Sequence, residues 1–362
     1  MTDEHWGFSV LDGSGPSDRE TWRAWWDAWQ KSEVFAHPSY VELYSDAESR
    51  PFCAVAGTPE RGILLPFLLR EVGRRDSRFS QLVGATDITS PYGYGGPFLA
   101  GDVGTAELEA FWRAFSTWAR DHNAISEFVR FGPARESAMG YGGDVVQSGF
   151  NVVRDLNLDA QALWMDVEHK VRKNVKRARR SGVTVKVDCG CTGLDSFIPI
   201  YTETMDRRRA DRSYYLSQSF FEKLCGDLAG SYAFFHASLD GIVVSTELVL
   251  ISDENVYSFL GGTNPDAFSV RPNDLLKYTI IEWAQALGKK RFILGGGYQP
   301  DDGILRYKLS FAPNGRTPFH VGRRVLDRRL YEEAVAARRA TGHGQTDTEW
   351  EPRPGYFPVY RA

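Results

Sequence analysis

The sequence predicts a mixed α/β (α+β) fold of two tandem domains, each a mixed sheet flanked by helices, on three observations. The chain has 362 residues, which matches about two domains of ~150 residues each. Its apolar share of 42% and charged share of 25% are typical of globular proteins and exclude disordered and collagen-like classes. One order of elements (strand, turn, strand, then a further strand, a helix and a last strand) is predicted twice.

The first copy of this order begins with two strands, over 52–56 and 62–69, around a polar turn. An aromatic segment follows and ends in Tyr94-Gly95-Gly96-Pro97. An amphipathic helix is then predicted over 106–121 and a strand over 126–131.

The second copy repeats the order in the C-terminal half. Its first two strands are predicted over 233–238 and 243–251, with a turn at Asp240-Gly241 between them. An aromatic strand then runs into Gly261-Gly262, and a helix over 273–287 and a strand over 291–294 complete the copy.

The spacing of corresponding residues agrees between the copies. Gly95 precedes Trp118 by 23 residues, and Gly261 precedes Trp283 by 22 residues. Each of these tryptophans is followed directly by an alanine. We interpret the agreement as an internal duplication; the alternative is chance similarity between two generic α/β patterns.

The segment between the copies is predicted to be helical. A long amphipathic helix is expected over 163–180, ending at Gly182, with a strand over 183–187 after it. Two further helices are expected near 194–209 and 219–229.

These patterns place an N-terminal domain over 1–160, a C-terminal domain over 161–341 and a surface tail over 342–362. The tail is polar and contains prolines. Residues 1–50 include an aromatic helix whose tryptophans have core spacing, which indicates packing rather than a ligand site. These tryptophans are Trp22, Trp25, Trp26 and Trp29.

Charge is unevenly distributed along the chain. The net charge of −4 argues against a general nucleic-acid binder, and no DNA partner is expected. Between Met165 and Gly182, however, seven basic and two acidic residues give +5, which leaves −9 for the rest. The cationic helix is either a solvated face or a surface that follows phosphates. In the second case its contacts come from Lys173, Lys176, Arg177 and Arg180.

Compartment signals are few. The first six residues lack the basic and apolar segments of a secretory signal, and no stretch approaches the ~18 apolar residues of a membrane span. Four cysteines in a chain of this length do not indicate a disulfide framework, and Cys189 and Cys191 lack the partners of a zinc site. We therefore expect a cytoplasmic protein without a metal.

Motifs of well-known catalytic sites are mostly missing. The sequence has no Walker loop, no Gly-x-Ser-x-Gly and no His-Glu-x-x-His. The seven histidines are scattered. His37 is either a binding residue in a cleft or an ordinary surface residue.

Two ionisable residues interrupt apolar segments. Lys308 stands among apolar residues after the glycine-rich turn 295–297, where open α/β sheets place ligands. Its ammonium could stabilise an oxyanion or a phosphate; the alternative is a surface lysine with a buried stem. Glu247 lies in an otherwise apolar strand. It either faces a pocket and accepts a proton from an amine, or is a paired, structural carboxylate.

A cluster of arginines and tyrosines follows the helix expected over 194–209. The planar guanidinium binds two oxygens of a carboxylate or phosphate at once, which makes the cluster a candidate substrate contact. The alternative is the ordinary preference for basic residues at a helix C-terminus. The candidates are Arg207, Arg208, Tyr214 and Tyr215.

The order of these features resembles the Fem family, the peptidoglycan bridge-forming aminoacyltransferases, within the acetyltransferase-like (GNAT) superfamily. The resemblance covers roughly residues 35–330. Its motifs are Ser90-Pro91-Tyr92-Gly93-Tyr94-Gly95-Gly96-Pro97, the basic segment 171–183, Tyr257 to Gly262, Pro272-Asn273-Asp274-Leu275-Leu276, and Tyr307-Lys308 with Phe311.

The resemblance implies two GNAT-like domains with a cleft between them, and transfer of an aminoacyl group from aminoacyl-tRNA to an amine without a metal or other cofactor. It also implies that Tyr307 and Lys308 contact the tRNA end and that Lys308 stabilises the tetrahedral oxyanion. The basic helix becomes a surface for the tRNA acceptor arm. We add Tyr94 and Asn273, from the matching segments, and His37 to the expected substrate-binding residues.

Two alternatives remain open. Relatives in the same superfamily use acyl-coenzyme A, but the stretch 269–272 does not match their pyrophosphate loop, and Pro272 removes one backbone N–H from such a loop. The other alternative is a non-catalytic binding module. The acceptor is expected to be a cell-wall precursor or a small peptide-like metabolite.

Overall fold

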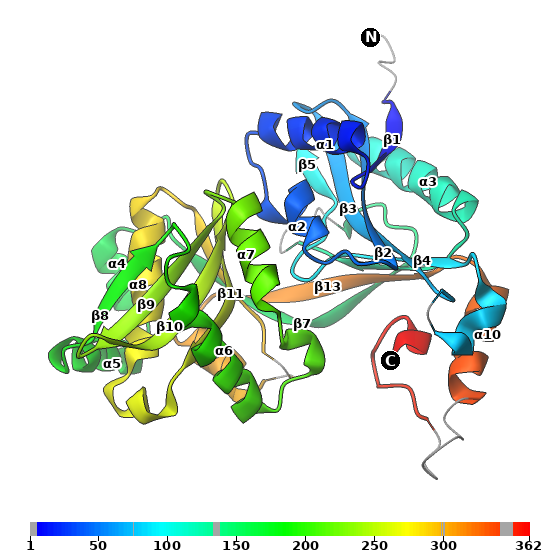
Figure 1. The fold of residues 1–362 in the computed structure, drawn as a ribbon. Coiled ribbons are helices and arrows are strands. Elements are labelled where there is room, and N and C mark those ends of the chain that lie inside the picture. The colour runs from blue at the N-terminus through cyan, green and yellow to red at the C-terminus, as the bar shows by residue number, and fades with distance from the viewer. Residues whose placement is uncertain (1–5, 75, 133–137, 298, 300, 341–349) are drawn as a thin grey trace. The chain divides into compact units, whose positions relative to one another are not determined.

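The computed structural model describes residues 6–74, 76–132, 138–297, 299, 301–340 and 350–362 (Figure 1). The chain forms two compact units. The first comprises Met1–Ser148 and Phe319–Ala362, and the second comprises Gly149–Pro318. Each unit contributes its own strands and helices, and the mixed α/β class predicted from the sequence is confirmed.

The first unit contains a mixed sheet. Its strands, in spatial order, are β1 (Phe8–Asp12), β2 (Ser49–Gly57), β3 (Gly62–Glu71), β4 (Thr86–Thr89), β6 (Ala124–Arg130) and β13 (Arg316–Val325), of which residues 319–325 belong to this unit. A short strand, β5 (Phe98–Ala100), pairs with β3. Strands β4 and β6 pair in parallel across the connecting helix α3 (Thr105–Asp121), and the other neighbours pair antiparallel.

Successive side chains of β2 and β3 point to opposite faces of the sheet, so the core of the first unit has two layers. Side chains such as Ala54 and Phe67 pack against α3, whereas Cys53 and Leu64 pack on the opposite face. That second face is covered by α1 (Pro16–Ala28) and α2 (Pro38–Glu42). Trp22 of α1 is fully buried there, and its indole N–H donates to the carbonyl of Ala36 at 2.9 Å.

The second unit repeats this arrangement. Its strands, in spatial order, are β8 (Thr184–Asp188), β9 (Tyr232–Leu239), β10 (Ile242–Ile251), β11 (Asn255–Thr263), β12 (Arg291–Gly295) and β7 (Asp144–Asp155), of which residues 149–155 belong to this unit. Strands β11 and β12 pair in parallel across α8 (Pro272–Ala286), and the other neighbours pair antiparallel. The two units therefore share the same strand order and the same strand directions, which confirms the duplication expected from the spacing.

Helices cover both faces of the second sheet (Figure 1). On one face, α8 packs on β9 and β10, and α5 (His169–Arg180) packs on α8. On the other face, α6 (Leu194–Arg208) packs on β10 and β11, with α7 (Gln218–Asp227) beside it. The remaining helices are α4 (Ala160–Asp166), α9 (Gly303–Leu309) and α10 (Arg328–Ala340), with 3-10 turns η1 (Val34–Ala36), η2 (Ser77–Leu82), η4 (Arg212–Tyr214), η5 (Pro265–Val270) and η7 (Val359–Arg361).

Two elements differ from the prediction. The helix expected over 163–180 is broken into α4 and α5, because Val167 and Glu168 have extended backbones and the Glu168 N–H donates to the carbonyl of Ser310 at 2.9 Å. The segment around Lys308, for which the sequence predicted no element, is the helix α9. Asp302 caps it by accepting from the N–H of Leu305 at 2.7 Å.

The units are bounded differently from the domains expected over 1–160 and 161–341. Residues 152–155 of β7 pair with β12, and residues 321–325 of β13 pair with β6. The first unit therefore ends within β7 and resumes within β13. Of the expected surface tail, residues 342–349 lie outside the described residues. The rest is anchored: Tyr360 is 1% exposed and donates to Asp87 at 2.9 Å.

The cysteines depart from expectation in one respect. Cys191 and Cys225 form a disulfide, with 6.0 Å between their Cα atoms, whereas Cys53 and Cys189 are free. Within the described ranges, no group of histidine, cysteine, aspartate or glutamate side chains is arranged to hold a metal ion. In the same ranges, no helix combines the length and apolarity needed to cross a bilayer.

Candidate functional site

Lys308 lies near the C-terminal end of α9 in the second unit. Its ammonium is half-buried and donates to the carbonyl of Gly296 at 2.6 Å. Burial lowers the pKa of Lys308 to about 8, with a further contribution from the nearby charge of Lys277. Gly295 has φ of +74°, and a Cβ there would lie 3.4 Å from the Lys308 Nζ, so this position favours glycine.

Glu247 of β10 is an ion-paired carboxylate. Its Oε1 accepts from the Nζ of Lys277 at 2.5 Å, and both side chains are about 5% exposed. The same Nζ donates to the hydroxyl of Ser258 at 3.1 Å. Lys277 comes from α8 and Ser258 from β11, so three elements meet at this pair.

The pair lies where two parallel strands stop pairing. Strands β11 and β12 pair from Asn255 with Arg291 to Tyr257 with Ile293. Ser258 and Gly296 follow the ends of this pairing, at the carboxyl side of both strands. Ligands of open α/β sheets bind at such strand ends. A β-bulge opposite Leu248 and Val249 alters the register of β11 at the same point.

A second set of contacts connects Lys308 to the cationic helix. The hydroxyl of Tyr307 accepts from the side-chain amide of Asn273 at 2.8 Å. The next residue, Asp274, is 7% exposed and accepts from the amide of Asn174 at 3.0 Å. Asn174 belongs to α5, so the cationic helix is joined to the first turn of α8 beside Tyr307.

Helix α5 turns its apolar side to the core and its cations outward. Val171, Val175 and Ala178 are buried against α8 and the sheet. The four residues expected to contact tRNA are all exposed on this helix: Lys173, Lys176, Arg177 and Arg180. Arg172 instead donates to the carbonyl of Met165 at 2.7 Å, which ties α5 to the end of α4.

The candidate arginines lie in the last turn of α6 and the candidate tyrosines follow the helix; some of them make contacts within the protein, and others are exposed. Arg207 donates to the carbonyl of Thr263 at 3.2 Å and packs over Phe268. Arg208 is exposed, and its charge acts on Lys308. Tyr215 is 42% exposed and donates to Asp206 at 2.8 Å. The backbone carbonyl of Tyr214 accepts from Tyr201 at 2.5 Å.

Two predicted binding residues, His37 and Tyr94, belong to the first unit. His37 is 2% exposed, so it is not a surface residue. Its Nδ1 accepts from the N–H of Ser39 at 3.0 Å and caps α2, and its Nε2 lies 2.6 Å from Arg23. Burial and Arg23 lower the pKa of His37 to about 3, which leaves the ring neutral. Tyr94 packs edge-on against Phe35.

The structure brings together Lys308, Tyr307, Asn273 and Glu247 in the second unit, with Arg208 within electrostatic range. Sequence reasoning missed Lys277, Asn174 and Asp274. Lys277 carried a usable signal, because it interrupts a buried helical run from Leu275 to Ile281 in the way that Glu247 interrupts its strand. Asn174 and Asp274 carried none, because polar residues at such positions are ordinary.

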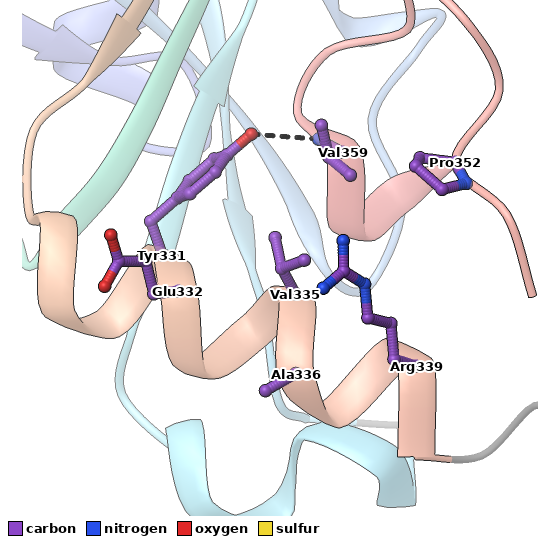
Figure 2. A pocket seen from close by; sticks show the side chains of 7 residues that line it. All are labelled: Tyr331, Glu332, Val335, Ala336, Arg339, Pro352 and Val359. Atoms are coloured by element: carbon purple, nitrogen blue, oxygen red, sulfur yellow. Dashed lines mark hydrogen bonds between the residues drawn. The ribbon is translucent and has the colours of Figure 1, made fainter.

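The first unit contains a pocket that is lined by other residues. It lies between α10 and the 350–362 segment, and Tyr331, Val335, Arg339 and Val359 are among its lining residues (Figure 2). Tyr331 accepts there from the N–H of Val359 at 3.1 Å. None of the predicted site residues lines this pocket, so it contributes nothing to the site around Lys308.

The arrangement in the second unit can stabilise negative charge. Lys308 offers a cation whose hydrogen-bond partner, among the described residues, is a neutral carbonyl that an anionic oxygen can replace. Tyr307 adds a phenol that stays neutral, because burial raises its pKa well above the usual value. Such a group of donors suits a reaction in which a carbonyl oxygen becomes an oxyanion.

Part of the chain matches a known protein family. Residues 166–309 match the family model of the acetyltransferase (GNAT) domain, a range that includes the cationic helix, strands β8 to β12 and Lys308. The sequence matches none of the curated proteins with which it was compared.

Solved structures show the same fold over most of the chain. FemX aligns with a TM-score of 0.67 and 14% identity, over 87% of this chain and 97% of that one. The C-terminal domain (DUF2156) of a putative lysylphosphatidylglycerol synthetase from Agrobacterium fabrum aligns with 0.57 and 12%, over 85% and 92%. L-PGS from Bacillus licheniformis aligns with 0.55 and 12%, over 91% and 98%. The expected Fem-like GNAT fold is confirmed.

Proposed function

We propose that this chain, an acyltransferase of the GNAT superfamily, takes its acyl group from aminoacyl-tRNA and transfers it to an amine to form an amide bond. The observation that carries the proposal is the placement of Lys308. Its ammonium lies on a neutral carbonyl at the ends of two parallel strands, in the unit whose contacts extend through Asn273, Asp274 and Asn174 to a cationic helix.

The reaction forms one bond and breaks another. The nitrogen of a neutral acceptor amine attacks the ester carbonyl, and the Lys308 ammonium donates to the oxyanion of the tetrahedral intermediate. The intermediate collapses by breaking the bond between the carbonyl carbon and the ribose oxygen. The proton lost by the amine reaches that ribose oxygen directly or by way of Glu247. No group becomes attached to the protein.

The cationic helix supports tRNA as the donor. Lys173, Lys176 and Arg177 are exposed on α5, so they can contact phosphates of an acceptor arm. Asn174 points from the same helix to Asp274, next to the Asn273–Tyr307 contact. A strand of phosphates lying along α5 would thus lead to the residues around Lys308.

The first turn of α8 supports the same donor over acyl-coenzyme A. A pyrophosphate needs free backbone N–H groups and no competing negative charge at a helix N-terminus. Here Pro272, the first residue of α8, has no N–H, and Asp274 places a buried carboxyl in the first turn. Burial raises the pKa of Asp274, but a neutral carboxyl still occupies the space.

The acceptor is proposed to lie near the end of α6. Arg208 is exposed, its charge reaches Lys308, and a guanidinium binds a carboxylate or phosphate through two oxygens. Tyr215 presents an exposed ring nearby in sequence. A cell-wall precursor or a small peptide-like metabolite carries both an amine and an anionic group, so either class fits these residues.

The decisive experiment incubates the protein with tRNA charged with radiolabelled amino acids and a mixture of peptide and cell-wall precursor amines. We expect amide products whose formation stops when the charged tRNA is treated with ribonuclease beforehand. Lys308→Met is the matched inactive variant, and Lys290→Met, an exposed lysine paired with Glu254, is the control. Transfer that survives ribonuclease treatment would overturn the proposal.

Acyl-coenzyme A remains a second candidate donor because the matched family model is that of acetyltransferases. The same assay with acetyl-coenzyme A in place of charged tRNA distinguishes the two. Thioester-dependent acetylation of the amine, without any tRNA-dependent product, would assign the second donor.

A further inference from the structure

The site contains two ammonium groups, those of Lys277 and Lys308, and one buried carboxylate, that of Glu247. The carboxylate pairs with Lys277, which the sequence analysis did not identify. Glu247 binds Lys277 at 2.5 Å, while Lys308 donates to the carbonyl of Gly296 instead. Lys308 nevertheless lies within electrostatic range of Glu247 and Lys277. The charges of Glu247, Lys277 and Lys308 therefore interact, but only Glu247 and Lys277 form an ion pair.

A buried carboxylate strongly favours a cationic partner, because removing one member of a buried ion pair leaves an uncompensated charge. Among the described residues, Lys308 is the other ammonium shown to interact electrostatically with Glu247. Without Lys277, we expect Glu247 to attract Lys308. A lysine held by a carboxylate offers less of its charge to an incoming oxyanion.

We propose that Lys277 is a positioning residue of the transfer site: it occupies Glu247 so that Lys308 stays unpaired and open to an anionic oxygen. The inference rests on the proposed function only for its effect on turnover. The pairing itself is a property of the free protein. Lys277 also donates to Ser258 of β11, which fixes its ammonium between α8 and the sheet.

The charges around Lys308 make the pairing measurable. Lys277 lowers the pKa of Lys308, as does Arg208 of α6, whereas Glu247 and Asp302 raise it. Removing Lys277 alone should thus raise this pKa, and removing Glu247 alone should lower it. Removing both leaves two opposed effects that largely cancel. A lysine reacts with acylating reagents only as the neutral amine, so its labelling rate reports the change.

The experiment is trace labelling with acetic anhydride at pH 7.5 on the full chain without substrates. Mass spectrometry of the peptide that carries Lys308 gives the rate, with exposed Lys173 as internal reference. The variants are K277M, E247Q and K277M/E247Q, and Lys223→Met, an exposed lysine of α7, is the control. Far-ultraviolet circular dichroism establishes that each variant is folded.

Lys308 should label severalfold more slowly in K277M and severalfold faster in E247Q than in the wild type. The double variant should lie within about twofold of the wild type. A wild-type rate in K277M, or a double variant as slow as K277M, would overturn the inference.

The test remains decisive if K277M does not fold. A neutral pair in place of a buried ion pair is often tolerated, so E247Q and the double variant can be compared with each other. The double variant should then label severalfold more slowly than E247Q, and equal rates would overturn the inference. Because no substrate is present, failure of tRNA-dependent transfer leaves this result unaffected, and failure here leaves the donor assignment unaffected.

Discussion

At the residue scale, the charge of Lys308 is the quantity that matters. Burial and Lys277 lower the pKa of its ammonium to about 8, so it titrates within the range of ordinary assays. The charged form stabilises an oxyanion and the neutral form does not. We predict that turnover, divided by the concentration of neutral acceptor amine, falls about tenfold per pH unit above about pH 8, because each unit lowers the charged fraction of Lys308 tenfold.

The matching variant is Lys308→Arg, since a guanidinium stays charged over this range. We expect lower turnover at pH 7, because the larger head does not fit the Gly296 carbonyl in the same way, but no fall between pH 8 and 9.5. Initial rates are measured and corrected for spontaneous ester hydrolysis. If the arginine variant shows the same fall as the wild type, the titrating group is not Lys308.

Single residues also show how far sequence reasoning reaches. Lys308 and Glu247 could be found because a charge inside an apolar run is unusual and has few explanations. Lys277 obeyed the same rule and was overlooked within the predicted helix. The role of His37 could not be predicted in this way. It is a buried helix cap that contacts Arg23 and Ser39, and no local sequence pattern identifies these contacts.

At the element scale, α5 separates its two roles by face. Its buried side holds the helix on α8, while the exposed Lys173, Arg177 and Arg180 project away from the core. Replacing these three with alanine should therefore leave the fold intact and weaken tRNA binding. Each lost phosphate contact lowers the slope of log K against log salt concentration by about one, so we predict a slope flatter by about two to three.

Filter binding or fluorescence anisotropy between 50 and 300 mM salt measures this slope. The matched control replaces Arg328, Arg329 and Arg339 of α10 with alanine, which removes the same charge from an exposed helix elsewhere. Equal slopes for the α5 variant and the wild type would show that the helix is only a solvated face.

Elements were predicted best where periodicity is local. The helix over 106–121 and the strand over 243–251 differ from α3 and β10 by a residue at one end. The break between α4 and α5 was missed because the Glu168 N–H bonds to Ser310, 142 residues away in the chain. The apolar periodicity of the sequence continues across the break, so the break can be recognised only from its distant hydrogen-bond partner.

At the scale of the whole molecule, the duplication was predictable but the exchange of end strands was not. The spacing of corresponding residues predicts the repeated order of elements, and the strand pairings of both units confirm it. Strands β7 and β13 each follow one copy and pair with the sheet of the other. The residues of either strand do not indicate which sheet it joins, so the domain bounds expected over 1–160 and 161–341 differ from the bounds of the two compact units.

The anchoring of residues 350–362 on the first unit gives the last prediction. A chain ended at residue 341 loses Tyr360 and Arg361, which bind the buried Asp87 at 2.9 and 2.8 Å. Asp87 keeps its ion pair with Arg70 at 2.6 Å, but it loses two hydrogen-bond partners while buried, so the unfolding midpoint of this unit should fall. Urea unfolding followed by tryptophan fluorescence measures it. Tyr356→Ala, which is 40% exposed in the same segment, should change little. An unchanged midpoint after truncation would show that these contacts do not hold the first unit together.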